Sequence, residues 1–259
     1  MKCREIMNII EKAYPRQYAL AWDNVGLLAG RDDKEVKRIY VALDATDDVV
    51  DAAAEQKADM LVTHHPLIFQ PLKQVTNEDF IGRRIVRLIQ NDISYYAMHT
   101  NYDVLGMAEF SGRKLKLRDP EVLDVTWEDG HPEGIGRVAD LEKPVTLEEC
   151  VKQVKESFCL ENVKVFGDLG RRIKRVAVSP GAGKSMIDAA LNKNADVLIT
   201  GDIDHHTGID AVARGLDIID AGHYGIEHIF IEDMKRYLEE NLADVEVAAA
   251  PLKNPFAII

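Results

Sequence analysis

Residues 36–63 read VKRIYVALDATDDVVDAAAEQKADMLVT, and residues 173–200 read IKRVAVSPGAGKSMIDAALNKNADVLIT. The second stretch repeats the first without a gap at an offset of 137 residues, and 11 of the 28 aligned positions are identical. Each copy has an apolar run at both ends, at residues 38–43 and 60–63 in the first copy and 175–178 and 197–200 in the second. Short continuous apolar runs are typical of strands that helices cover on both faces. The repeat therefore predicts two β-α-β units.

The sequence around each copy extends this pattern into a larger α/β layer. A further helix and strand are expected after the first copy at residues 81–90 and 93–98, and after the second at residues 208–214 and 216–219. The charged, turn-rich stretch 118–132 is the predicted connection between the halves. Residues 226–242 and 245–249 predict a last helix and strand, and the pattern leaves open whether they return to the first layer.

Composition restricts the class of protein. The 259 residues carry 32 Lys and Arg against 44 Asp and Glu, a formal net charge of −12, which disfavours binding along a nucleic-acid backbone. The three cysteines fit neither a disulfide framework nor a zinc finger and are expected to be free thiols. No apolar run reaches the roughly 18 residues of a membrane span, so we expect no membrane partner and a cytoplasmic location.

Histidines gather where the predicted strands end. Seven of the eight lie at or just beyond the carboxyl end of an expected strand: His64, His65, His99, His205, His206, His223 and His228. Ligands bind at this edge in open parallel α/β sheets. The positions of these histidines therefore favour a functional site.

His64 and His65 are adjacent, and Pro66 directly after them ends the expected strand. Adjacent side chains of an extended strand point in opposite directions, so the two imidazoles cannot easily bind one ion. At a strand end that bends, each could bind one of two metal ions. The alternative is a structural pair, with one ring packed and the other exposed.

Two further pairs combine an imidazole with a carboxylate four residues later. In the first pair, His99 and Asp103 could share a helical face, although Asp103 could instead be a helix N-cap. In the second, Glu227 beside His223 could bridge two metal ions or form a simple surface ion pair. With His64 and His65, these side chains are enough for two cations about 3.5–4 Å apart, an arrangement that activates water for hydrolysis.

Other motifs are less decisive. His205 and His206 could contact substrate or transfer protons near such a site, or could only pack in a loop. Residues 179–185 could cradle an anion on backbone N–H groups, but they lack the glycine spacing of a Walker A loop. A Gly-x-Ser-x-Gly nucleophile elbow is absent from the sequence.

Taken in order, the motifs resemble the NIF3 family, whose bacterial members are often called GTP cyclohydrolase 1 type 2 homologues. The resemblance spans nearly the whole chain and is to the short form, without an inserted domain. It is carried by WDNVGL at residues 22–27, THHPLIF at 63–69, HTNYD at 99–103, GIGR at 134–137, SPGAG at 179–183, TGD at 200–202, and DAGHY at 220–224 followed by Glu227.

This resemblance implies two interlinked, internally repeated α/β domains, at residues 1–110 plus 226–259 and at 111–225. It implies a toroidal homohexamer and two divalent metal ions, for which the donor types admit zinc, manganese, iron or nickel. It also implies a ligand set, with Glu227 bridging and His99 near by as a proton shuttle. The terminal metal ligands would be His64, His65, Asp103 and His223.

The activity that this resemblance implies is hydrolytic opening of the purine ring of GTP, with His99 and Glu227 as catalytic residues. One alternative is a dinuclear hydrolase of the phosphoesterase type, which needs the same metal ions and a different pocket. The other is a metal-binding regulatory or interaction protein without catalysis.

Overall fold

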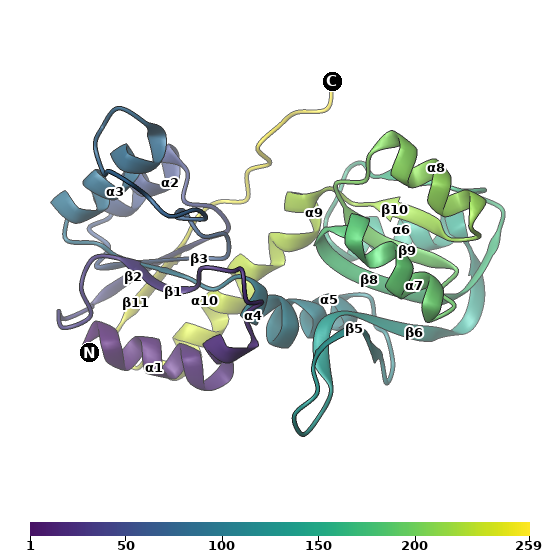
Figure 1. Cartoon of the computed structure of the whole chain (residues 1–259), viewed down its shortest axis with the longest axis horizontal. Helices are drawn as coiled ribbons and strands as arrows, with labels where there is room; N and C mark the ends of the chain where they lie inside the picture. Colours follow the sequence, from purple (N-terminus) through teal and green to yellow (C-terminus); the bar gives the residue numbers. More distant parts are fainter. The chain divides into compact units, whose positions relative to one another are not determined.

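The computed structural model describes residues 1–259 as a mixed α/β protein with two sheets, which confirms the predicted fold class (Figure 1). The chain forms two compact units. Unit 1 comprises Met1–Tyr102 and Phe230–Leu252, and unit 2 comprises Asp103–Ile229 and Lys253–Ile259. None of the helices combines the length and apolar character needed to cross a lipid bilayer.

Unit 1 is built on a five-stranded sheet in the order β1-β4-β3-β2-β11. All neighbours are parallel except β1, which pairs antiparallel with β4. The strands are β1 Gly26–Ala29, β2 Arg38–Ala42, β3 Met60–Thr63, β4 Ser94–Ala97 and β11 Glu246–Ala249. Because β11 pairs with β2, the carboxyl-terminal strand returns to the first sheet, which settles the question that the sequence left open.

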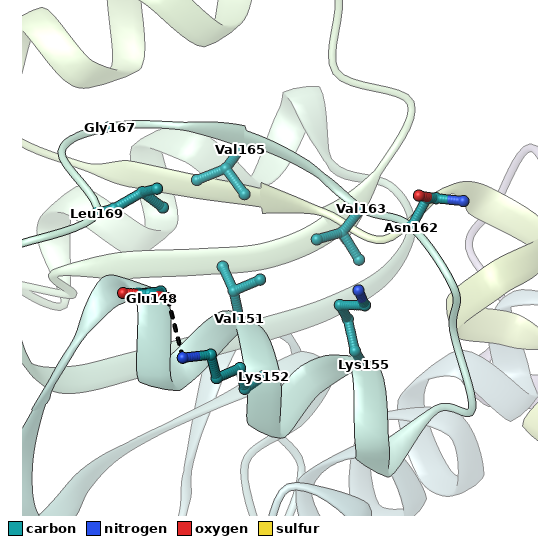
Figure 2. A pocket seen from close by; sticks show the side chains of 9 residues that line it. All are labelled: Glu148, Val151, Lys152, Lys155, Asn162, Val163, Val165, Gly167 and Leu169. Carbon is teal, nitrogen blue, oxygen red and sulfur yellow. Dashed lines mark ion pairs between the residues drawn. The ribbon is translucent and has the colours of Figure 1, made fainter. Parts of the chain in front are cut away.

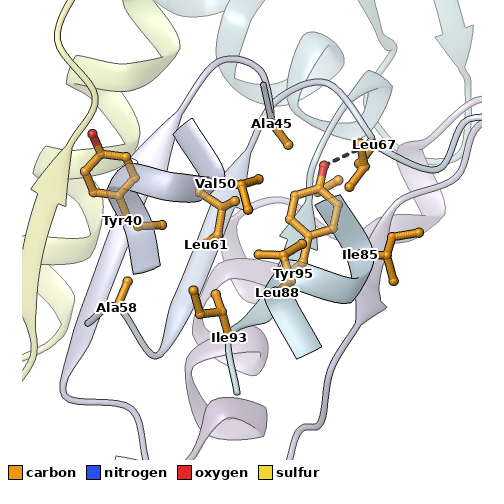
Figure 3. Packing of buried hydrophobic residues seen from close by; sticks show 12 residues of the cluster. Tyr40, Ala45, Val50, Ala58, Leu61, Leu67, Ile85, Leu88, Ile93 and Tyr95 are labelled. Carbon is orange, nitrogen blue, oxygen red and sulfur yellow. Dashed lines mark hydrogen bonds between the residues drawn. The ribbon is translucent and has the colours of Figure 1, made fainter. Parts of the chain in front are cut away.

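The helices of unit 1 cover both faces of this sheet (Figure 1). Helices α2 and α3 lie on one face, where Tyr40, Leu61 and Tyr95 from three adjacent strands meet Val50 and Leu88 (Figure 3). Helices α1 and α10 lie on the other. The bounds are α1 Cys3–Ala13, a 3₁₀ turn Arg16–Tyr18, α2 Asp47–Glu55, α3 Phe80–Gln90, α4 Thr100–Tyr102 and α10 Ile229–Asn241.

Unit 2 contains a six-stranded sheet in the order β5-β6-β8-β9-β10-β7. Its centre, β8-β9-β10, is parallel, and the outer pairings are antiparallel. The strands are β5 Glu121–Trp127, β6 Glu133–Thr146, β7 Lys164–Phe166, β8 Arg172–Ala182, β9 Val197–Gly201 and β10 Asp217–Asp220. The helices are the π-helical segment Asp103–Met107, α5 Ala108–Lys114, α6 Leu147–Ser157, a 3₁₀ turn Gly183–Met186, α7 Ile187–Asn192, α8 His205–Ala213 and α9 His223–Glu227.

The two copies of the sequence repeat become β2-α2-β3 and β8-α7-β9, and identical residues form the same contacts in both. The Asp59 carboxylate accepts hydrogen bonds from the backbone N–H groups of Lys37 and Arg38 at 2.7 and 3.0 Å. Asp196 does the same for the corresponding residues of the second copy, at 2.7 and 2.8 Å. In each copy this carboxylate connects the start of the first strand to the start of the second. These identities are therefore explained by the fold.

One part of the expected organisation is wrong. Residues 118–132 are not a connection between the halves, because they contain β5, an edge strand that pairs antiparallel with β6. Most residues of β5 are exposed or only partly buried, and Leu123 alone is fully buried. An edge strand with so few buried side chains has the polar composition of a loop. The chain passes from unit 1 to unit 2 earlier, between Tyr102 and Asp103.

Candidate metal centre

The His64-His65 pair lies where β3 ends at Thr63 and the backbone bends. The bend brings the two rings to the same side, with centroids 4.9 Å apart, which an extended strand would not allow. The Tyr95 hydroxyl fixes the bend by donating to the His65 carbonyl oxygen at 3.0 Å and accepting from the Leu67 N–H at 2.8 Å (Figure 3). A bent strand end therefore lets both neighbouring imidazoles point toward one place.

His99, directly after β4, completes a group of three imidazoles within unit 1. Its ring lies 5.2 Å from that of His64 and 5.6 Å from that of His65, centroid to centroid. One ring nitrogen from each of the three can be chosen so that all lie within 4.8 Å of one another. His64 is fully buried, and the other two rings are largely buried. Three converging imidazoles are a donor set that could hold a metal ion.

Each of these rings is oriented through its Nδ1 atom. Nδ1 of His64 donates to the Met98 carbonyl oxygen at 3.0 Å, and Nδ1 of His65 donates to Asp44 at 2.7 Å. His99 donates through Nδ1 to Asp23 at 2.9 Å. The acceptors are carbonyl or carboxylate oxygens, which assigns the proton to Nδ1 and the lone pair of the neutral ring to Nε2. This is the arrangement by which proteins orient metal-binding histidines.

Asp23 is the acidic partner of His99 and has an unusually low pKa. Burial would raise the pKa of this carboxyl, but the hydrogen bond and charge interaction with His99 and the hydrogen bonds from Thr100 outweigh burial and lower it to about 2. The Thr100 N–H and hydroxyl donate to Asp23 Oδ2 at 2.9 and 2.5 Å. Asp23 is therefore a fixed anion that holds the His99 ring in one orientation.

Unit 2 brings together a second group of predicted ligands. His223 is the first residue of α9 and Glu227 the last, so the four-residue spacing places the imidazole Nε2 3.0 Å from Glu227 Oε2. Nδ1 of His223 donates to Asp202 at 2.7 Å, which repeats the orientation seen in unit 1. Glu227 is buried, so the pair is not the exposed surface ion pair of the alternative reading.

Asp103 and Gly181 lie beside the Glu227 carboxylate. A carboxylate oxygen of Asp103 lies within 4.8 Å of one of Glu227. Asp103 begins the π-helical segment inside a continuous helical stretch, so it does not have the N-cap position of the alternative. Gly181, at φ +80°, leaves room for Glu227, because a Cβ there would lie 2.6 Å from Glu227 Oε1. His and Glu side chains thus form groups that could hold a metal ion.

The remaining sequence motifs have structural explanations or lie outside these groups. Residues 179–182 continue β8 and do not form the expected loop before the helix, and Gly181 faces Glu227 there. His205 and His206 begin α8 with exposed side chains, so neither packs in a loop. His228 follows α9, not a strand end as expected, and its Nε2 lies 2.9 Å from the Phe158 carbonyl oxygen.

No role was predicted for the three aspartates that orient the histidines. Asp44 and Asp202 each follow a strand within two residues, and Asp23 lies in the WDNVGL motif. The available signal for Asp44 and Asp202 was their position just after a predicted strand. Its partner could not be assigned, because Asp23 and His99 are 76 residues apart in the chain.

A hollow of about 540 Å³ lies between α6 and the β7 segment in unit 2 (Figure 2). Its walls combine apolar side chains, such as Val151 and Val165, with Glu148 and Lys152, which form an ion pair at 2.9 Å. No predicted metal ligand lines it. This hollow is therefore separate from the candidate metal centre.

Comparisons with known proteins identify the family of this chain. A family model described as Duf34/NIF3 (NGG1p interacting factor 3) matches residues 1–255. The chain belongs to the Duf34/NIF3 family. Among its curated relatives, a Clostridium perfringens protein named GTP cyclohydrolase 1 type 2 homolog is 35% identical over 263 residues, covering all of both chains. A protein of the same name from Streptococcus pneumoniae is 35% identical, covering 93% of this chain and 91% of its own.

Solved structures of Duf34/NIF3 relatives share the whole fold. A Bacillus cereus protein related to NIF3 superposes with a TM-score of 0.93 at 25% identity, covering 100% of this chain and 99% of its own. Reduced HcgD from Methanocaldococcus jannaschii superposes with a TM-score of 0.83 at 32% identity, covering 96% and 97%. The predicted family is thereby confirmed.

Proposed function

We propose that this Duf34/NIF3 protein is a hydrolase that uses two divalent cations and opens the purine ring of GTP. The observation that carries the proposal is the common orientation of four histidines. In both units each donates Nδ1–H to a carbonyl or carboxylate oxygen, which leaves the Nε2 lone pair to bind a metal ion or, in His99, to accept a proton. The proposed metal ligands are His64, His65, Asp103, His223 and Glu227, with Glu227 bridging.

The donor set fits two divalent cations. Imidazole nitrogens with carboxylate oxygens suit zinc, iron, nickel and manganese. Ligands about 2.0–2.2 Å from one ion lie about 3.0–3.5 Å from each other, as follows from octahedral or tetrahedral angles. The 3.0 Å between His223 Nε2 and Glu227 Oε2 agrees with that spacing. The names of the relatives support the choice of GTP as substrate.

The chain runs directly between the two groups of proposed ligands. Asp103 follows His99 by four residues, at the point where the chain enters unit 2. Three residues after Glu227 the chain re-enters unit 1 at Phe230, whose ring lies 5.3 Å from that of His64. Three residues span at most about 11 Å. Both groups are therefore joined by short chain segments, at Asp103 and again after Glu227.

The proposed ligands would hold the cations that activate water, and His99 would transfer the proton. When bound, the two cations would lower the pKa of water and stabilise negative charge developing on the substrate. His99, held by Asp23, presents Nε2 as the atom that accepts a proton from the attacking water and returns it to the ring nitrogen that leaves. Addition of one water at C8 of guanine and cleavage of one C8–N bond gives a formamide, and a second water cleaves the remaining C8–N bond and releases that carbon as formate.

The test is formate release from GTP by purified protein supplied with manganese, zinc, iron or nickel. We expect Glu227→Gln to lower turnover at least 100-fold, because it removes the bridging charge. Glu239→Gln is the matched control, because Glu239 is a half-exposed side chain on α10 that pairs only with Lys235. Absence of formate with every metal would refute the GTP assignment.

The two alternatives give different results in the same experiments. A phosphoesterase-type hydrolase would release phosphate from a panel of phosphate esters and lose that activity in Glu227→Gln. A regulatory metal-binding protein would bind metal in elemental analysis but turn over no substrate of the panel. The homohexamer stays a prediction, for which light scattering should give six times the 29.0 kDa chain mass.

A further inference from the structure

Two large aromatic side chains are exposed beside the imidazole group of unit 1. Trp22 is 58% exposed and Phe69 is 49% exposed, and their ring centroids lie 5.7 Å apart at an angle of 50°. They come from two separate loops, one before β1 and one after the His64-His65 bend. Exposed aromatic side chains that gather at one place commonly mark a binding surface.

Hydrogen bonds on both sides of Trp22 hold its loop in place. The Leu20 N–H donates to the Thr100 hydroxyl at 2.8 Å, and Asp23 accepts from Thr100 and His99. The Asn24 amide donates to the Ile68 carbonyl oxygen at 2.6 Å, which connects the loop directly to the residue before Phe69. The exposure of Trp22 is therefore built into the loop.

The same contacts connect the aromatic pair to the candidate centre. The His99 ring lies 5.9 Å from that of Trp22 and 6.4 Å from that of Phe69, edge-on to both. His99 is itself a member of the imidazole group with His64 and His65. A flat molecule stacked on one of the two tilted rings, with the other ring against its edge, would lie next to the His99 ring.

We propose that Trp22 and Phe69 are the stacking site for the planar heteroaromatic ring of the substrate, a purine base in the proposed reaction. The inference rests on the proposed function and narrows the class of substrate to molecules with a planar ring. Aromatic side chains bind bases through their π faces without needing hydrogen bonds, so a binding site for a base requires no separate guanine-reading motif. The fixed position of Trp22 would hold the stacked ring beside His99.

The two tryptophans of the chain provide a direct probe. Trp127 lies in β5 of unit 2 and donates its indole N–H to the Asp129 carbonyl oxygen at 3.2 Å. Trp127→Phe leaves Trp22 as the single tryptophan, and Trp22→Phe leaves Trp127 as the matched control. In metal-free protein, guanosine and GTP should quench the Trp22 fluorescence in a saturable way, whereas inorganic triphosphate should not. Neither nucleoside nor nucleotide should change the Trp127 signal.

Affinity gives a second readout that does not depend on turnover. By equilibrium dialysis, Trp22→Ala and Phe69→Ala should each bind guanosine about tenfold more weakly than Trp127→Phe. Zinc affinity should stay the same in all three, because none of these side chains is a proposed ligand. Unchanged Trp22 fluorescence together with unchanged guanosine affinity in Trp22→Ala would overturn the stacking site.

These outcomes separate the stacking site from the hydrolase. Guanosine binding at Trp22 without formate release would reject the GTP hydrolase and leave the stacking site intact. Formate release with a wild-type KM in both alanine variants would support the GTP hydrolase and reject the stacking site. If Trp22→Ala instead changes the oligomeric state in light scattering and leaves guanosine affinity unchanged, the aromatic pair is a contact between copies of the chain, and the proposal is wrong.

Discussion

Replacing Tyr95 by Phe tests whether the bend at the end of β3 prepares the histidines for metal. The Tyr95 hydroxyl is buried, and burial raises its pKa, so it remains a neutral hydrogen-bonding group at any physiological pH. It contacts three groups: the Leu67 N–H, the His65 carbonyl oxygen and the Thr63 hydroxyl. The substitution removes one oxygen atom from the centre of the bend.

The size of the effect follows from those contacts. The Leu67 N–H is buried and would lose its acceptor, at a cost of about 1–3 kcal/mol for an unsatisfied buried donor. The His65 carbonyl keeps the Thr63 hydroxyl as a donor at 2.9 Å, so little is lost there. We expect the free energy of unfolding to fall by about 2 kcal/mol. With the bend less fixed, metal affinity should fall roughly tenfold, as for other residues that orient ligands.

Tyr96→Phe is the matched control. Tyr96 is the next residue of β4, is equally buried, and donates its hydroxyl to Glu11 at 3.1 Å, on the other face of the sheet. Urea unfolding with a chelator present measures the free energy of unfolding, and competition with a chromophoric zinc chelator measures the zinc affinity. We expect Tyr96→Phe to lower stability by about 1 kcal/mol and to leave zinc affinity unchanged.

The comparison between the two variants decides the question. If Tyr95→Phe binds zinc as tightly as Tyr96→Phe, the bend does not depend on this hydroxyl, and the reasoning is wrong. If stability falls in Tyr95→Phe but affinity does not, the hydroxyl supports only the fold.

Three further predictions follow from other contacts. Asp59→Ala and Asp196→Ala should each lower the free energy of unfolding by about 2 kcal/mol, because each carboxylate accepts two backbone hydrogen bonds. Clearly different losses of unfolding free energy in urea titrations of the two variants would contradict the view that the two carboxylates have the same role. The folded-state pKa of Asp23, about 2 against 3.8, should contribute about 2 kcal/mol to stability above pH 4 and lose it as pH falls toward 2, so metal-free Asp23→Asn should show a weaker loss over that window than wild type. One thiol per native chain should react rapidly with an aromatic disulfide reagent, because Cys159 is exposed whereas burial raises the pKa of Cys150 to about 12; rapid reaction of native Cys159→Ser would contradict this.

The sequence predicted the regular parts of this molecule because their signals are local. Continuous apolar runs predicted β3 and β9 almost residue for residue. The edge strand β5 was missed because its exposed side chains resemble those of a loop.

The contact between His223 and Glu227 was predictable from the sequence, but the hydrogen bonds that orient the histidines were not. His223 and Glu227 are four residues apart, and helical periodicity alone places them in contact. The hydrogen bonds that fix the imidazoles join residues far apart in sequence, such as Asp44 with His65 and Asp23 with His99. Such pairs depend on strand order and loop packing, which a single sequence does not encode in any local pattern.

The equivalent contacts of Asp59 and Asp196 show which part of the repeat is the same in both copies. At the same offset, Asp44 corresponds to Gly181 and His65 to Asp202. In the first copy, His65 donates a hydrogen bond to Asp44. In the second copy, Asp202 accepts a hydrogen bond from His223, and Gly181 leaves the room that the Glu227 carboxylate occupies. The two copies thus share the contacts at the start of their strands and differ at the strand ends, so the strand ends are the positions at which new side chains could be introduced without changing the shared frame.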